Sequence, residues 1–546
     1  MGEIVTARNG MVASSQKLAT EVGVGLLRQG GTAVDAAIGV NAMLSLIEPF
    51  MCGLGGDLFA QVWAPQQGKL FGLNASGRSP QDVDLKDLQR QLGDAPVIPN
   101  NGLASITVPG AVAGWEALHE KFGKLPLETI FAPVIEYGRQ GVHIGSNTHE
   151  WWREAAAVVT SDNMLGDLSR GFKECFLVDG AAPQAGTLFK NPALSETYLE
   201  LAQSGWRCFY EGRLADSLIG SLNSMGSRLS RRDLESCRAD WVTPIFTDYC
   251  DYRVYELPPN GQGLSVLQML NCLEHYFLNT RRSEPDGEYW HYFIESKKLA
   301  FEDRAAFYAD PSSMDVSVAA LNSKAYAQKR FDSIGEKAIC DPVAGFPELS
   351  NGDTTYLSVA DKSGMMVSLI QSIYNGFGSA IVPDEMGFAI QSRGAGFSLD
   401  ASHPNVYAPS KRPFHTIIPA FVTRNEEPFM SFGVMGADMQ PQGQVQVLAN
   451  IINYGMDVQQ AGDAVRLRHD GKNAPNHSDV SDNGVVWYEP GFSASIIDEL
   501  EARGHDMRPA THPVAHFMGG YQCVKKSLEG WSGASEPRFD GCAAGY

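Results

Sequence analysis

The chain has 546 residues, of which 44% are hydrophobic and 19% are charged, as in an ordinary globular protein. Disordered, collagen-like and coiled-coil classes are therefore excluded. The formal net charge of −20 repels nucleic-acid phosphates and anionic membrane surfaces, so we expect neither nucleic acid nor membrane among its partners.

The N-terminus, MGEIVTARNG, lacks the basic and apolar regions of a secretory signal, and no stretch of about 18 apolar residues is present. We therefore expect a cytoplasmic protein. The nine cysteines form no CxxC pair, which favours reduced thiols over a disulfide framework or a metal site.

The first predicted elements are two helices and a hairpin. Residues 15–28 place apolar side chains four apart on one helical face, and a Gly-Gly pair follows as a stop signal. Thr32 and Asp35 then have the spacing of a capping box, and the segment from there to Pro49 is small and apolar on all sides. This second helix is predicted to be buried. The sequences LFAQVWA and KLFGLNA flank a turn and predict a hairpin.

Residues 100–340 are predicted to be mainly helical, and residues 340–353 to be a linker or an exposed processing site. The linker sequence, CDPVAGFPELSNGD, holds two prolines, an Asn-Gly pair and no apolar periodicity. Beyond it the hydrophobic period changes from that of helices to that of strands.

This change of period predicts a second hairpin, whose first strand is residues 354–360. Asp361–Gly364 supplies the turn. If the two central residues of that segment form the turn, Thr354 lies opposite Gln371, beside Ser372. The start of the first strand is then next to the end of its partner.

Thr354 follows the linker directly. A threonine hydroxyl is a poor nucleophile unless a base is adjacent. If the chain is cut before Thr354, the freed α-amine, with a pKa of about 7.7–8.0 in model peptides, can be that base. On these few residues alone, a threonine pair that caps or edges a strand is the more ordinary interpretation.

Longer motifs change this balance, because the sequence resembles the γ-glutamyltransferase family, which includes the cephalosporin acylases. The resemblance runs in order from about residue 8 to the C-terminus. The motifs that carry it include GMVASSQKLATEVGVGLLRQGGTAVDAAIG, EPFMCGLGGDLF, PGAVAGWEALHEKFGKLPLE, SKKLAFEDRAAFYADP, DTTYLSVADKSG, KRPFHTIIPAF and GVMGADMQPQGQ.

The resemblance implies an N-terminal nucleophile hydrolase of mixed α/β (α+β) class with a four-layer αββα sandwich and no cofactor. The precursor would cut itself between Asp353 and Thr354. The products would be a heavy chain of residues 1–353 and a light chain of residues 354–546. These two chains would stay interwoven as one structural domain.

The same resemblance implies the roles of the catalytic residues. Thr354 would be the nucleophile and its own α-amine the base, and Ser372 would position that amine. Gly436 and Ala437 match the backbone pair of the oxyanion hole. The family pattern has glycine at both positions, so a positive φ at Ala437 would be strained.

The substrate pocket departs from the γ-glutamyl pattern at each of its anchoring positions. These positions carry Ser76 in place of an arginine, Ala395 in place of an aspartate, His415 and Thr416 in place of two serines, and Tyr374, followed by Asn375, in place of an asparagine. Without a counter-charge for an α-ammonium group, we expect γ-glutamyl compounds to bind weakly. Arg78, Arg393, His415 and Tyr374 remain as candidate recognition groups.

These departures favour an amidohydrolase or acyltransferase that acts on a small amide, with water as the default acceptor and an amine as an alternative. Two arginines could hold the far carboxylate of a dicarboxylic monoamide. Three alternatives stay open: a true γ-glutamyltransferase acting on glutathione, a biosynthetic enzyme that cleaves an unusual bond, and an uncleaved scaffold.

Several of these side chains also have purely structural interpretations. Arg78 could pair with a surface carboxylate, and His415 could be a hydrogen-bonded core histidine. Gln440 and Gln442 are expected to cap the helix that follows them. His291 and Glu295 share a helical face at metal-ligand spacing, but a second pair is missing, so no metal is predicted.

Overall fold

The computed structural model describes residues 2–163, 165–279, 283–340, 342, 353–471, 475, 483–511 and 518–546. Most of the predicted linker, residues 341 and 343–352, lies outside them. In the part of the chain described here, no helix combines the length and apolar character that crossing a bilayer requires. All nine cysteines are free thiols.

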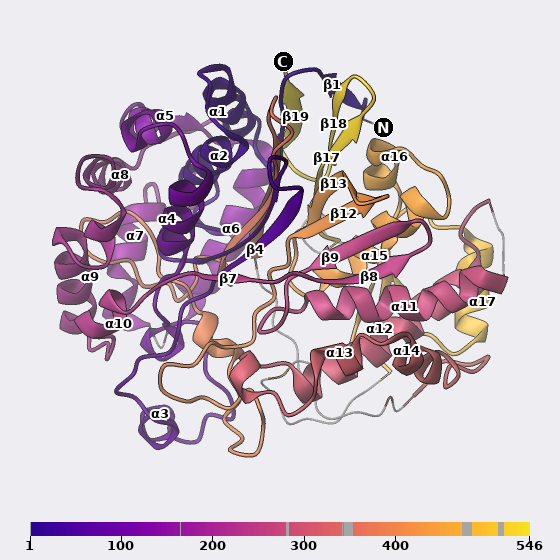
Figure 1. Ribbon diagram of the computed structural model, residues 1–546. Coiled ribbons are helices and arrows are strands. Elements are labelled where there is room, and N and C mark those ends of the chain that lie inside the picture. Colours follow the sequence, from indigo (N-terminus) through magenta and orange to yellow (C-terminus); the bar gives the residue numbers. More distant parts are fainter. Residues whose placement is uncertain are drawn as a thin grey trace.

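Two seven-stranded sheets lie face to face at the centre of the molecule (Figure 1). Sheet I has the order β1 (Val5–Ala7), β18 (Gly530–Ser535), β17 (Tyr521–Ser527), β13 (Glu427–Val434), β12 (Ala420–Arg424), β9 (Tyr252–Glu256), β8 (Ile245–Tyr249). Sheet II has the order β19 (Cys542–Gly545), β2 (Met11–Ser14), β10 (Asp353–Ala360), β11 (Met366–Tyr374), β3 (Asp57–Ala64), β4 (Lys69–Ala75), β7 (Asp240–Val242). Neighbouring strands in both sheets are antiparallel.

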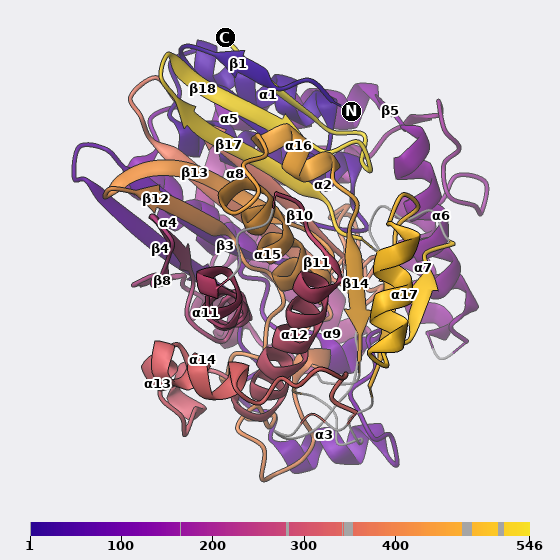
Figure 2. The same ribbon diagram turned by 90° about the vertical axis from the view of Figure 1, so that its right-hand side faces the viewer.

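Helices cover the outer face of each sheet, so the layers run helix, sheet, sheet, helix, as expected (Figures 1 and 2). On sheet II lie α1 (Lys17–Arg28), α2 (Ala33–Ile47) and α4 (Ala111–Phe122), with α5 (Leu127–Gln140) and α8 (Pro192–Ser204) packed behind them. On sheet I lie α11 (Gly263–Asn279), α15 (Met439–Ile452) and α16 (Val458–Asp463), with α12 (Gly287–Phe307), α14 (Lys324–Phe331) and α17 (Ala494–Ala502) packed behind them.

The remaining elements lie around this sandwich. The helices are α3 (Leu85–Leu92), α6 (Ser146–Ser161), α7 (Arg170–Phe176), α9 (Arg213–Ser224), α10 (Arg231–Glu235) and α13 (Val318–Leu321). A three-stranded sheet joins β14 (Leu467–Asp470), β15 (Val485–Tyr488) and β16 (Met507–Pro509), and a two-stranded sheet joins β5 (Val142–His143) and β6 (Leu188–Phe189). Residues 100–340 are mainly helical with short strands, as predicted.

Helix α2 confirms the predicted buried helix and its start signal. Thr32 accepts a hydrogen bond from the backbone N–H of Asp35, and the Asp35 side chain accepts one from that of Thr32, which completes the capping box. Every residue of the helix is buried, because it lies between sheet II and the outer helices. That position explains why its sequence is apolar on all sides.

The hairpin β10–β11 forms as predicted, but its register differs by one residue. Thr355, not Thr354, lies opposite Gln371. The reason is the turn: the Asp361 carboxylate accepts hydrogen bonds from the backbone N–H groups of Ser363 and Met365, which closes a longer connection than the sequence suggested. An irregularity in the ladder between Asp353 and Thr355 then brings Thr354 beside the end of β11.

Candidate active site

Thr354 is at the start of β10, in the middle of sheet II, and its side chain is almost fully buried. Its Oγ1 accepts a hydrogen bond of 3.3 Å from Nε2 of Gln440, in the first turn of α15. Because α15 covers sheet I, this bond connects the two halves of the sandwich at the predicted nucleophile.

The interpretation of Gln440 and Gln442 as helix caps is wrong. The Oε1 atom of Gln440 accepts from the backbone N–H of Ile418 at 3.0 Å, so both ends of this amide are used. Gln442 bonds to both backbone groups of His469 instead. A glutamine near the start of a helix looks the same in the sequence whether it caps the helix or is buried. Only the contact with Thr354 shows that Gln440 belongs to the site.

Ser372 lies near Thr354, as the sequence predicted. It is on β11, opposite Asp57 of β3, and its Oγ accepts hydrogen bonds from the backbone N–H of Tyr374 at 2.8 Å and from Nη2 of Arg393 at 3.0 Å. The ladder places the Thr354 backbone next to the Ser372–Tyr374 segment. A hydroxyl is therefore available beside the nitrogen that cleavage before Thr354 would release.

Arg393 is fully buried and forms one wall of this site. Besides Ser372, its guanidinium donates to Oγ1 of Thr416 at 2.9 Å and stacks 4.1 Å from the ring centroid of Tyr374. Burial lowers the pKa of Arg393 to about 10, so the group keeps its charge at neutral pH. Within the described residues, no carboxylate forms an ion pair with it.

His415 is a hydrogen-bonded core histidine and not a free recognition group. Its Nδ1 accepts from the backbone N–H of Ile417, so Nε2 carries the proton and faces Oδ2 of Asp57 at 3.2 Å. Burial lowers the pKa of His415 well below its ordinary value, and the positive charge of Arg393 lowers it further. A neutral imidazole therefore donates to Asp57.

Asp57 was not singled out in the sequence. Its carboxylate accepts hydrogen bonds from the backbone N–H groups of Gly77 and Gly110 and from Nε2 of Gln391. Burial raises the pKa of Asp57 to about 7. The only sequence signal was an aspartate directly after a Gly-Gly pair at the start of a predicted strand.

Arg78 lies apart from these residues. Its side chain is 44% exposed and pairs with Asp310 at 3.4 Å and with Asp240 at 3.7 Å. The interpretation as a partner of surface carboxylates is therefore favoured over substrate recognition. Asn375, the last predicted group, follows Tyr374 and is half-buried at the end of β11.

Gly436 and Ala437 form the turn between β13 and α15, and both have positive φ, 112° and 45°. The expectation of strain at Ala437 is thus met, because an L-residue pays a steric cost in this conformation. Among the residues described, neither backbone N–H donates to a protein acceptor. The turn is held by Gln262, whose Nε2 donates to the Ala437 carbonyl at 2.9 Å.

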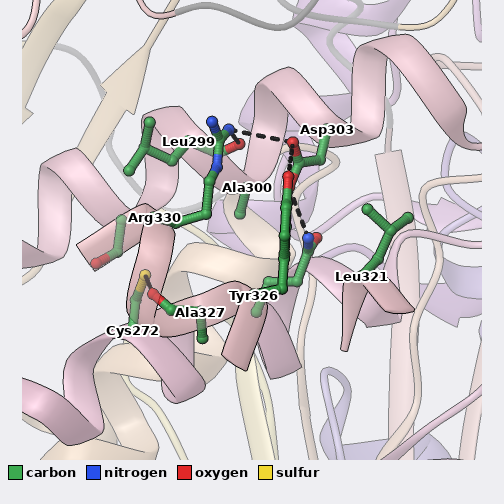
Figure 3. Close-up of a pocket in the computed structure, with 10 residues that line it drawn as sticks. Cys272, Leu299, Ala300, Asp303, Leu321, Tyr326, Ala327 and Arg330 are labelled. Atoms are coloured by element: carbon green, nitrogen blue, oxygen red, sulfur yellow. Dashed lines mark hydrogen bonds and ion pairs between the residues drawn. The ribbon is translucent and has the colours of Figure 1, made fainter. Parts of the chain in front are cut away.

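A separate small pocket lies between α11, α12 and α14 (Figure 3). Asp303 is its polar centre and accepts hydrogen bonds from Tyr326, Arg330 and Gln268. The close-up in Figure 3 shows Tyr326 and Arg330 directed toward it. Its volume of about 10 Å³ gives room for about one water molecule. This pocket therefore cannot hold a substrate.

Comparison with known proteins shows what this chain is similar to. Residues 19–546 match the gamma-glutamyltranspeptidase family. The chain is 33% identical to the glutathione hydrolase-like YwrD proenzyme of Bacillus subtilis over 100% of both chains, and 33% identical to the oxamate amidohydrolase proenzyme of Klebsiella pneumoniae over 98% of both. The crystal structure of cephalosporin acylase from Bacillus halodurans covers 100% of this chain and 97% of its own, with 38% identity and a TM-score of 0.92.

Proposed function

The chain belongs to the gamma-glutamyltranspeptidase family and is an amide hydrolase or acyltransferase, and we propose that Thr354 is the residue that forms its acyl-enzyme. The observation that carries this proposal is the meeting of four groups at one point. They are the buried hydroxyl of Thr354, the Gln440 amide bonded to it, the Ser372 hydroxyl beside it, and the Gly436–Ala437 turn that leads into the helix of Gln440.

Self-cleavage between Asp353 and Thr354 would release the α-amine that acts as base. The relatives named as proenzymes support this step. The heavy chain would be residues 1–353 and the light chain residues 354–546. Their association needs no further contact, because β10 of the light chain pairs with β2 of the heavy chain and β11 pairs with β3.

The proposed catalytic cycle uses these groups. The α-amine, held by Ser372, takes the proton of the Thr354 hydroxyl, and Oγ1 attacks the amide carbonyl. The backbone N–H groups of Gly436 and Ala437 would stabilise the oxyanion, a contribution of about 3–4 kcal/mol. The protonated amine passes its proton to the leaving group, and water then hydrolyses the acyl-enzyme in the same way.

We propose that the acyl group carries a second carboxylate, as in a dicarboxylic monoamide. Arg393 is a buried cation whose direct partners are the neutral hydroxyls of Ser372 and Thr416. The Asp57 carboxylate compensates this charge from a distance, without a direct ion pair. A buried charge is stable only when it is well compensated, and a substrate carboxylate would add the direct ion pair. Ala395, by contrast, offers no counter-charge to the α-ammonium of a γ-glutamyl group.

The first experiment is an intact-mass measurement of the purified protein beside Thr354→Ala. We expect two fragments that separate before Thr354 in the natural protein and a single chain in the variant. An uncut natural chain that is inert toward amides would favour a non-catalytic scaffold.

The second experiment compares glutaryl-p-nitroanilide with γ-glutamyl-p-nitroanilide. We expect a higher kcat/KM for the glutaryl compound. Its only charged group is the carboxylate that Arg393 would bind, whereas the γ-glutamyl compound also carries an α-ammonium group without a counter-charge. A clear preference for the γ-glutamyl compound would identify a true γ-glutamyltransferase. If the protein chain is cut before Thr354 but neither compound is hydrolysed, the substrate is to be sought among compounds with an unusual bond.

A further inference from the structure

Three metal-ligand side chains meet outside the catalytic site, where the turn after α17 packs against α12. His291 and Glu295 are one turn apart on α12, and His505 lies between α17 and β16. All three are buried, and one ligand atom of each lies within 4.8 Å of those of the other two. The sequence showed only the first two, because the third is 214 residues from His291.

The hydrogen bonds of His291 fix which of its nitrogens faces the cluster. Nε2 is 2.8 Å from the carbonyl oxygen of Gly335, which only accepts, so in the neutral ring Nε2 carries the proton. The lone pair of Nδ1 then points at Nε2 of His505, 2.9 Å away. A metal-binding histidine usually has this arrangement, in which the other ring N–H donates to a carbonyl or carboxylate.

The other two ligand atoms complete a triangle of suitable size. Nε2 of His505 is 2.9 Å from Nδ1 of His291 and 3.9 Å from Oε1 of Glu295. Bonds of 2.0–2.1 Å in a tetrahedral zinc site place ligand atoms about 3.3 Å apart. Since all three ligand atoms lie within 4.8 Å of one another, shifts of about 1 Å or less would bring them onto one ion.

We propose that His291, Glu295 and His505 form a binding site for a divalent transition metal of the zinc type. Two imidazoles and one carboxylate are a ligand set that suits Zn²⁺. On metal binding His505 would carry its proton on Nδ1 in place of Nε2, which leaves the Nε2 lone pair free for the ion. A water molecule can complete the coordination shell.

Lys298 is the competing cation at this site. Its Nζ lies 2.6 Å from Oε1 of Glu295, but it also donates to the carbonyl of Ile339 at 2.8 Å and to Oδ1 of Asn483 at 3.1 Å. These two acceptors can keep the ammonium bonded when the metal occupies Glu295. Removal of the Lys298 charge should therefore strengthen metal binding.

The position of the site suggests its role. His291 and Glu295 precede the proposed cut, whereas His505 follows it. If the cleavage proposed above occurs, the metal would join the heavy chain to the light chain. That consequence rests on the proposed function, whereas the metal site itself does not.

Isothermal titration of Zn²⁺ into chelator-treated protein tests the site. We expect one tight ion per chain, more than about tenfold weaker binding in His505→Ala and Glu295→Gln, and roughly tenfold tighter binding in Lys298→Met. Cys250→Ser and His143→Ala, which change an exposed thiol and an exposed imidazole, serve as controls that should leave this affinity unchanged.

Equal Zn²⁺ affinity in the natural protein and in Glu295→Gln would overturn the proposal. So would a Lys298→Met variant that binds Zn²⁺ no more tightly than the natural protein. Glu295→Gln keeps the shape of a buried side chain, so it carries the test if His505→Ala does not fold by circular dichroism. The titration is repeated on Thr354→Ala, whose chain is expected to stay whole. Zn²⁺ binding by this uncut variant would show that the metal site exists whether or not the proposed cleavage occurs.

Discussion

Nε2 of Gln440 donates a hydrogen bond of 3.3 Å to Oγ1 of Thr354, and this bond joins the helix layer of sheet I to β10, an inner strand of sheet II. It directs one lone pair of the hydroxyl oxygen toward Gln440. A hydrogen bond of this kind contributes about 0.5–1.5 kcal/mol, so Gln440→Met should slow self-cleavage and kcat by roughly two- to tenfold. The rate of fragment formation on denaturing gels and steady-state hydrolysis measure the two effects.

Gln444→Met is the matched control for this prediction. Gln444 is buried on the same helix and its Nε2 donates to the carbonyl of Ile418, the residue whose N–H bonds Gln440. Its loss should cost stability without changing the rate of self-cleavage. Equal slowing in both variants would mean that Gln440 acts through the helix and not through Thr354.

Arg393 should determine the preference for an anionic acyl group. Charge-assisted hydrogen bonds contribute about 1.5–3 kcal/mol, so Arg393→Met should lower kcat/KM for glutaryl-p-nitroanilide by roughly 10- to 100-fold relative to a neutral butyryl compound. The ratio of the two substrates is the measured quantity, because loss of the Ser372 contact would slow both alike.

Arg78→Met removes the same charge from the partly exposed pairing with Asp240 and Asp310. That variant should keep the natural substrate ratio. If it is the variant that loses the preference for glutaryl compounds, Arg78 and not Arg393 holds the carboxylate.

The sequence predicted those parts of the fold that depend on local chemistry. The capping box of α2 and both hairpins depend on residues a few positions apart, and they are present. The register of β10–β11 was one residue off because a side chain, that of Asp361, lengthens the turn. A backbone pattern alone does not contain that information.

The candidate site divides in the same way. Ser372, Tyr374, Arg393 and Thr416 are brought together as expected, because the resemblance fixed their places along the chain. Gln440 was assigned to the wrong role, and Asp57 was missed altogether. Both are buried polar side chains whose partners are distant in sequence, so their contacts appear only once the sheets are stacked.

Ala437 predicts a stabilising substitution. Its φ of 45° costs an L-residue roughly 1–2 kcal/mol, of which the greater flexibility of unfolded glycine offsets about half. Ala437→Gly should therefore raise the free energy of unfolding by about 0.5–1 kcal/mol in urea titration. The backbone N–H is kept, so kcat should stay within roughly twofold. A loss of stability would show that the Ala437 methyl group provides packing that outweighs the strain.

Glu48 gives the protein a pH-dependent stability with a predictable sign. Burial raises the pKa of this carboxyl from 4.5 to about 7, against the hydrogen bonds from Ser15 and Gln16. Between these two pH values the folded chain holds the proton more tightly than the unfolded chain, so stability falls as pH rises. The stabilisation is complete below about pH 4.5 and is lost above about pH 7, a change of roughly 3 kcal/mol.

Glu48→Gln isolates this contribution, because it removes the ionisable group and keeps the side-chain shape. The free energy of unfolding, measured in urea at pH 5 and pH 8, should fall less between these values in the variant than in the natural protein. Glu128→Gln, which removes an exposed carboxyl in the first turn of α5, should leave the natural difference in place. If Glu48→Gln also keeps that difference in full, the Glu48 carboxyl is not the group that takes up the proton on folding, and the next carboxyl to test is Asp57, whose pKa burial also raises to about 7.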